Sequence, residues 1–338
     1  MRPAISPRTS TRSPLADVLS GWPPPVFDPA GPAAGSIATL GWVLLAMAAV
    51  VTAVVLFFVY VALWGRPGTR EKLGGTKIIW LAGIAFPVVV LTFLLIYGLT
   101  LTRSLTAPIT GNEMRVRVVG EMWWWRVAYL DPQGRAVILD ANELHIPVGR
   151  PVVLELSSND VIHSFWVPRL SGKLDMIPGR RNLMRIQADR PGVYGGQCAE
   201  YCGGPHALMG FAVIAHTPEN FARWRTQRLG LKAAAVSSDQ AAVSSGEANR
   251  GRQLFRSAGC AACHRIGGTD ANGLAGPDLT HVASRRTLGA GILPNNRGTL
   301  IGWIGNSQAI KPGNRMPPYS VLSGDELTAL AVYLETLK

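Results

Sequence analysis

The chain has 338 residues, a net charge of +12 and a hydrophobic content of 48%, much of which lies in two long uncharged runs near the N-terminus. This length allows two or three domains. The positive charge comes mostly from arginines that do not cluster with aromatic residues, which argues against nucleic acid as a partner and leaves anionic lipid or an acidic protein surface.

Residues 1–35 are rich in proline, serine, glycine and alanine. Their early arginines are not followed closely by an apolar core, so this segment does not form an ordinary signal peptide. We expect an N-terminal arm that is poorly ordered at its start.

Two uncharged runs follow, from Ser36 to Gly65 and from Ile78 to Thr102. Each is longer than the roughly 20 residues that a helix needs to cross a bilayer, and Pro87 is tolerated in such a helix although it can kink it. We predict a transmembrane hairpin over residues 36–103, with helices at about 38–64 and 78–102. Buried helices of a soluble core are the alternative, which the length of both runs disfavours.

The loop between the two runs is basic. Its charged residues are Arg66, Arg70, Lys72 and Lys77, against the single acid Glu71. Short cytoplasmic loops of membrane proteins are enriched in lysine and arginine. We therefore expect this loop in the cytoplasm and both ends of the chain on the outer side of the membrane.

The rest of the chain divides into three parts. Short β-prone segments separated by turn signals predict a β-sandwich or barrel over residues 112–225. Residues 226–246 are rich in alanine and serine and repeat Ala-Ala-Val-Ser-Ser, which predicts a flexible linker. Helix signals return over residues 247–338, including a capping box from Ser323 to Glu326.

The segment from Gln197 to Gly210 gathers soft metal ligands within a glycine-rich loop: Cys198, Cys202, His206 and Met209. Thiolate, imidazole and thioether together suit copper better than zinc or an iron–sulfur cluster. A structural zinc knuckle or a disulfide loop is the alternative, disfavoured because methionine is a poor zinc ligand.

This loop needs a further ligand, and His163 stands out among the six histidines. It follows a strand within the aromatic, water-poor segment Asp160-Val-Ile-His-Ser-Phe-Trp-Val-Pro168. The nearby Asp160 can set the tautomer or orientation of the imidazole.

These motifs resemble those of a known family. Asp160-x-x-His163-Ser-Phe-Trp-x-Pro168, Asp175-x-Ile-Pro-Gly-Arg180 and Cys198-x-Glu200-Tyr-Cys202-x-x-x-His206-x-x-Met209 are similar to segments of subunit II of the haem–copper cytochrome c oxidases. The resemblance covers roughly residues 25 to 225 and includes the two N-terminal membrane helices. It implies a cupredoxin-type β-sandwich that holds a dinuclear copper centre, CuA.

The same resemblance implies a role for each ligand. Cys198 and Cys202 would bridge the two coppers, and His163 and His206 would each bind one copper. Met209 and the main-chain carbonyl of Glu200 would be weak ligands. The Glu200 side chain would bind a magnesium ion at the interface with subunit I.

The segment Gly120-Glu-Met-Trp-Trp-Trp-Arg126 corresponds to an aromatic segment of the family. By this resemblance Trp123 would be the surface residue where electrons enter from cytochrome c. Packing of the sandwich and its membrane-facing rim is an equally favoured role for Trp123 and the preferred one for Trp124 and Trp125.

A second site lies in the last part of the chain. Cys260-Ala-Ala-Cys263-His264 is the attachment signature of a covalently bound c-type haem. Residues 246–338 resemble class I cytochrome c, which implies Met316 as the distal axial ligand opposite His264. Both cysteine pairs lie among ligand-type residues, so we predict no disulfide. Attachment of haem c outside the bacterial cytoplasm agrees with the charge of the loop.

The sequence therefore predicts a multidomain membrane protein: a two-helix transmembrane hairpin, a cupredoxin-like β-sandwich and an all-α class I cytochrome c domain. The resemblance implies subunit II of a cytochrome c-fused oxidase of the caa type, in the bacterial inner membrane with both metal domains on the periplasmic side. Electrons would pass from haem c to CuA and then to haem a of subunit I, where oxygen is reduced to water.

The implied partners are subunit I, other oxidase subunits and membrane lipid, with the cytochrome bc complex or a soluble cytochrome c as donor. The linker would raise the effective concentration of the tethered domain. Two alternatives stay open: a CuA-bearing subunit of a nitric oxide reductase, and a membrane-anchored copper carrier.

Overall fold

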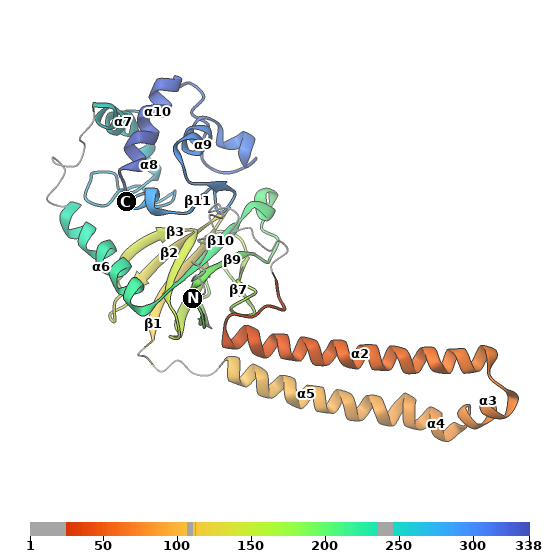
Figure 1. Ribbon diagram of the computed structural model, residues 1–338. Helices are drawn as coiled ribbons and strands as arrows, with labels where there is room; N and C mark the ends of the chain where they lie inside the picture. Colours follow the sequence, from red (N-terminus) through yellow and green to blue (C-terminus); the bar gives the residue numbers. More distant parts are fainter. Residues whose placement is uncertain (1–24, 107–110, 112, 236–245) are drawn as a thin grey trace, which may run out of the picture. The chain divides into compact units, whose positions relative to one another are not determined.

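The computed structural model describes residues 25–106, 111, 113–235 and 246–338. The chain forms two compact units (Figure 1). One comprises residues 33–110, and the other combines residues 1–32 with residues 111–338. The predicted poor order at the start of the N-terminal arm falls on residues outside the described ranges.

The first unit is helical, and its two long apolar segments have little surface buried. Its elements are α2 (Pro32–Trp64), α3 (Pro67–Leu73), α4 (Thr76–Trp80), the π-helical turn η1 (Leu81–Ala85) and α5 (Phe86–Leu105). Among the described residues, two helical stretches, Pro32–Trp64 and Thr76–Leu105, are long and apolar enough to cross a membrane, and none of either apolar window is buried. An apolar surface of this size needs a covering, and these helices suggest membrane anchoring.

Pro87 sits where a helix tolerates it. It lies in the first turn of α5, directly after the π-helical turn η1. Proline in a continuous helix lacks an N–H, and its ring crowds the preceding turn, but a π-turn widens the backbone locally and makes room for it. The long helical stretch therefore continues through this proline.

In the part of the chain that the structure describes, the second unit begins with a sandwich of two five-stranded sheets. The strands are β1 (Met114–Glu121), β2 (Trp124–Leu130), β3 (Ala136–Ala141), β4 (Glu143–Pro147), β5 (Val152–Ser158), β6 (His163–Trp166), β7 (Lys173–Met176), β8 (Asn182–Ile186), β9 (Gly192–Cys198) and β10 (Gly210–His216). The sheet orders are β3-β2-β1-β5-β8 and β4-β10-β9-β6-β7.

The core of the sandwich explains its strand pattern. Val116 and Val118 of β1 are fully buried, and so are Leu154 and Leu156 of β5, with which β1 pairs in parallel. Every second residue of a strand points to the same face, so these side chains share the inner face. The fold agrees with the predicted β-sandwich.

Helix α6 (Pro218–Ala235) runs into the segment 226–246 that the sequence predicts to be a flexible linker. The first ten residues of that segment are helical. The helix is held to the sandwich because Phe221 and Trp224 are buried in its core and Leu229 packs against it. Alanine also favours helix. Residues 236–245 lie outside the described ranges.

The C-terminal part is helical and has its own core. Its elements are α7 (Gly246–Ser257), α8 (Cys260–Cys263), the 3₁₀ turn η3 (Val282–Ser284), the short strands β11 (Thr287–Leu288) and β12 (Leu293–Pro294), α9 (Arg297–Ile310) and α10 (Gly324–Glu335). Helices α7 and α10 cross closely at Gly251, which has no side chain. A Cβ at this position would lie only 2.0 Å from the carbonyl oxygen of Ala329. The predicted capping box is confirmed: Ser323 and Glu326 each accept the other's main-chain N–H.

Candidate metal centre

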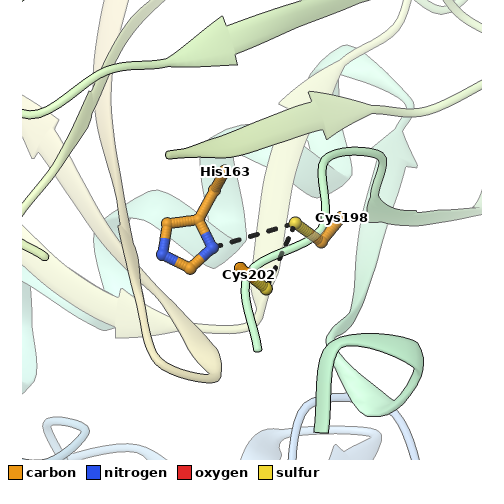
Figure 2. Close-up of side chains that lie close together, drawn as sticks. All are labelled: His163, Cys198 and Cys202. Atoms are coloured by element: carbon orange, nitrogen blue, oxygen red, sulfur yellow. Dashed lines mark hydrogen bonds between the residues drawn. The ribbon is translucent and has the colours of Figure 1, made fainter. Parts of the chain in front are cut away.

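The loop between β9 and β10 brings its ligand-type side chains to one point. Cys198 ends β9, Cys202 follows in the loop, and His163 begins β6 next to β9. Figure 2 shows the three side chains directed at one another. The two sulfur atoms are 3.8 Å apart, and Nδ1 of His163 is 3.8 Å from Sγ of Cys198. All three residues are buried, and their ligand atoms lie within 4.8 Å of one another.

The remaining predicted ligands surround the same two sulfur atoms. Nδ1 of His206 lies 3.4 Å and Sδ of Met209 lies 3.9 Å from Sγ of Cys202. The carbonyl oxygen of Glu200 lies 3.2 Å from Sγ of Cys198. Each sulfur therefore has one imidazole and one weaker donor beside it. The structure brings together all six residues that the sequence predicts for this site.

The protonation of the two thiols depends on their pairing. The hydrogen bond from the Cys202 thiol lowers the pKa of Cys198 to about 4. The same pairing raises the pKa of Cys202 far above its usual range, because a second thiolate would lie beside the first in a buried site. Without a cation the pair therefore keeps one proton. A metal that binds both sulfurs must displace this proton.

The orientation of His163 is set by Asp160. Nε2 of His163 lies 2.9 Å from Oδ1 of Asp160, which leaves Nδ1 facing the sulfurs. Partial burial raises the pKa of Asp160, but hydrogen bonds from His163 and from the N–H of Met122 outweigh it, so the carboxylate stays ionised. Gly120 also lies against the ring, because a Cβ at this position would be only 2.7 Å from Cδ2 of His163. These two contacts fix the imidazole of His163, the predicted ligand, in one position.

The donor set fits copper. Two thiolates, two imidazoles and a thioether are soft or borderline donors, which favour copper over magnesium, calcium or manganese. The sulfurs and His163 are nearly inaccessible to water, since Cys198, Cys202, His163 and Met209 are at most 5% exposed. Among the described residues, the cluster of His163, Cys198 and Cys202 is the group that could hold a metal ion.

The predicted haem site lies in the C-terminal part. Cys260 and Cys263 stand one turn apart in α8, and His264 follows directly. Nδ1 of His264 lies 2.8 Å from the carbonyl oxygen of Pro277, which leaves Nε2 available for a metal. Gly276 contacts the ring closely, because a Cβ there would lie 2.6 Å from Cε1 of His264. These features fit a haem iron ligand.

Met316 lies in a loop that is pinned to α9. Its carbonyl oxygen accepts hydrogen bonds from Ser307 (3.0 Å) and Gln308 (2.9 Å), and its N–H donates to Asn314 (2.8 Å). The side chains of Met316 and Cys260 pack against the same hydrophobic core. The position of Met316 therefore suits the predicted axial ligand.

Comparison with known proteins covers both parts. A family model for the periplasmic domain of cytochrome c oxidase subunit II matches residues 129–216, and a model for cytochrome c matches residues 248–338. Cytochrome c oxidase subunit 2 of Alkalihalophilus pseudofirmus is 34% identical over 323 residues, which cover 92% of this chain and 90% of the relative. The chain belongs to the cytochrome c oxidase subunit 2 family.

A further relative and a solved structure also match parts of this chain. The Bacillus subtilis cytochrome c oxidase subunit 2 is 29% identical, over 84% of this chain and 83% of the relative. The crystal structure of the periplasmic domain of subunit II of the Bradyrhizobium japonicum oxidase is 30% identical, with a TM-score of 0.32, and matches 34% of this chain and 92% of that chain. Membership in the cytochrome c oxidase subunit 2 family makes this chain a component of an oxidoreductase.

Within this family member, the three consecutive tryptophans have different surroundings. Trp125 is fully buried and packs edge-on against Phe165 and Phe211, in agreement with its predicted packing role. Trp124 is half-buried beneath the guanidinium of Arg126, 4.8 Å from its ring. Trp123 is also half-buried, and its Nε1 donates to the carbonyl oxygen of Cys202 (2.8 Å). Among the described contacts of these three residues, only Trp123 makes a hydrogen bond to the loop between β9 and β10.

The sequence did not predict a group of buried charged residues: Asp140, Glu143, Arg285 and Lys311. They lie where the sandwich meets the C-terminal helical part. Asp140 and Glu143 stand in strand-like segments, and Lys311 follows an apolar helix. A charged residue within a β-prone or apolar segment is the sequence feature that indicates a buried charge. It does not identify a partner more than a hundred residues away.

Proposed function

We propose that this chain is the electron-transfer subunit of a cytochrome c-fused haem–copper terminal oxidase. In this proposal it accepts electrons at haem c, passes them to CuA and delivers them to haem a of subunit I for the reduction of oxygen to water. The observation that carries the proposal is the pair of sulfurs 3.8 Å apart, each beside its own imidazole, in a chain that also holds a haem c signature.

The residues of the copper site would have different roles in binding two metal ions. Cys198 and Cys202 would bridge them, and His163 and His206 would each bind one. Met209 and the Glu200 carbonyl would be the weak ligands. When bound, the copper pair supplies a one-electron redox couple. The stiff sandwich keeps the ligands in place, which reduces the reorganisation that accompanies each electron.

The residues of the haem site would attach the haem and bind its iron. Cys260 and Cys263 would attach the haem covalently, and His264 and Met316 would be its axial ligands, an arrangement that raises the potential of the iron. The Pro277 carbonyl holds His264 in one tautomer, since it accepts a hydrogen bond from the Nδ1–H group. The chain thereby offers a fixed imidazole nitrogen to the iron.

The two apolar helices would anchor the chain in the inner membrane as a hairpin, with the basic connecting loop in the cytoplasm and both metal domains in the periplasm. Tyr201, which follows Glu200 in the loop between β9 and β10, is exposed. This surface would face subunit I, where the Glu200 side chain would bind magnesium. The donor would be a cytochrome bc complex or a soluble cytochrome c.

The test is to purify the chain with its partner subunits and to record copper content, optical spectra and paramagnetic resonance. We expect two coppers and one haem c per chain, a mixed-valence copper signal, and oxygen uptake. One labile copper would indicate a copper carrier instead. Reduction of nitric oxide without oxygen uptake would indicate a nitric oxide reductase subunit.

A further inference from the structure

Lys311 is a buried lysine whose ammonium group joins three segments of the chain. Only 2% of the residue is exposed. Its Nζ donates to the carbonyl oxygens of Trp123 (2.7 Å), Leu208 (2.8 Å) and Gly289 (2.9 Å). The first two belong to the copper-binding sandwich and the third to the haem-binding part. An ammonium has three donors, and all three are used.

The turn between β11 and β12 lies against the end of the loop that runs from Cys198 to Met209, which we call the copper loop. The N–H of Gly210, next to Met209, donates to the carbonyl oxygen of Ala290 (2.9 Å). Gly289, Ala290 and Gly291 all have positive φ angles, of 66°, 68° and 90°. This left-handed turn directs successive carbonyls to Lys311 and to the copper loop.

Lys311 is also connected to the predicted haem ligand. The side chain of Asn314 donates to the carbonyl oxygen of Lys311 (2.8 Å) and accepts from the N–H of Met316 (2.8 Å). The loop that carries Met316 is therefore tied to the residue that contacts the copper loop.

Two further buried contacts surround this junction. Arg285 pairs with Asp140 at 2.8 Å, and the two side chains are 5% and 1% exposed. Oε1 of Glu143 accepts from the N–H groups of Arg286 (2.7 Å) and Thr287 (3.3 Å). Both contacts join the sandwich to the haem-binding part. The junction therefore includes polar contacts from β3 and β4 in addition to those of Lys311.

We propose that Lys311 is a positioning residue for electron transfer, which locks the haem-binding part onto the copper loop in one orientation. The inference rests on the proposed function. A buried ammonium without acceptors is costly, so a docked orientation that buries Lys311 away from the Trp123 and Leu208 carbonyls is disfavoured. Electron transfer then occurs from a docked domain and does not wait for a tethered domain to diffuse.

The experiment uses the purified oxidase complex with Lys311→Met, Lys311→Arg and the control Lys338→Met, which removes an exposed lysine of the same part. The rate of electron transfer from reduced haem c to oxidised copper is measured at several solvent viscosities. We expect a fast, viscosity-independent rate in the wild type and in Lys338→Met. Lys311→Met should be slower by about tenfold or more and should depend on viscosity, because docking limits the rate. Lys311→Arg, which keeps the charge, should recover part of the rate.

Two additional measurements separate positioning from folding. The haem c and copper spectra of Lys311→Met should equal those of the wild type. Hydrogen exchange at the peptide that contains Gly210 should increase, while α10 remains protected. A wild-type rate in Lys311→Met, or loss of the methionine-ligated haem spectrum, would overturn the proposal. If wild-type haem c does not reduce the copper at all, the proposed function fails instead.

Discussion

The indole Nε1 of Trp123 donates a 2.8 Å hydrogen bond to the carbonyl oxygen of Cys202, so this tryptophan is bonded to the backbone of a predicted copper ligand. Its own carbonyl accepts from Lys311 of the haem-binding part. A single residue thus lies in hydrogen-bond contact with both sides of the junction. We therefore predict that Trp123 is the point where electrons reach the copper centre.

Replacement of Trp123 with phenylalanine should slow the reduction of copper by haem c. The substitution removes the bond to Cys202 and retains an aromatic ring, so we expect a fall of about tenfold, equal to about 1.4 kcal/mol in activation free energy. Stopped-flow absorbance of the copper centre measures it. Trp124→Phe is the matched control, since that side chain contacts Arg126 instead. Equal slowing in both variants would contradict a special role for Trp123.

Replacement of Asp160 with asparagine should weaken copper binding. The carboxylate that orients His163 loses its charge, and changes of this kind typically cost about 10–100-fold in metal affinity. Competition with a copper chelator measures the affinity. Asp189→Asn removes an exposed carboxylate of the same sandwich and should leave it unchanged. An unaltered affinity in Asp160→Asn would show that packing alone orients His163.

The two methionines should act independently. Met209→Leu removes the thioether beside Cys202 and should change the copper spectrum while the haem c bands stay intact. Met316→Leu should have the opposite effect, with loss of the methionine-ligated haem spectrum and an unchanged copper signal. Optical and paramagnetic resonance spectra of both variants serve as controls for each other. If either substitution removes both signals, the two sites are not separate.

Replacement of Glu143 with glutamine should flatten the pH dependence of stability. Burial, with a contribution from Asp140, raises the pKa of Glu143 to about 7 from a usual 4.5. The folded state then binds more protons than the unfolded state, so stability falls as pH rises from about 4.5 to 7, by up to about 3 kcal/mol. Glutamine keeps an oxygen for the Arg286 and Thr287 N–H groups without the charge. The variant should therefore be the more stable one above pH 7.

Thermal unfolding of the purified complex, followed by the haem c absorbance between pH 4.5 and 8, measures this effect. Burial also lowers the pKa of Lys311, although the three carbonyls that it contacts favour its ammonium form, and this makes stability rise with pH in both proteins. The comparison between variant and wild type cancels this contribution. Glu247→Gln, at an exposed position, is the control. Parallel pH profiles for Glu143→Gln and the wild type would refute the prediction.

Much of the architecture follows from local sequence patterns. Long uncharged runs predict the helices of the first unit, and short β-prone segments predict the sandwich, because hydrophobic periodicity is a local property. The ligands of the copper loop lie within a dozen residues, so their spacing alone indicates a metal site. The haem signature is a pentapeptide. The sequence did not predict that α6 extends to Ala235, since that depends on the packing of Phe221 and Trp224 against the sandwich.

The sequence by itself therefore determined which elements form and which residues are candidate metal ligands. Only the tertiary structure decided how the two metal-binding parts meet. Lys311 and Trp123 are 188 positions apart, and Arg285 and Asp140 are 145 apart. A buried charge needs a partner to offset its desolvation, but the identity of that partner depends on which strands and loops become neighbours when the chain folds. No local pattern of residues contains that information.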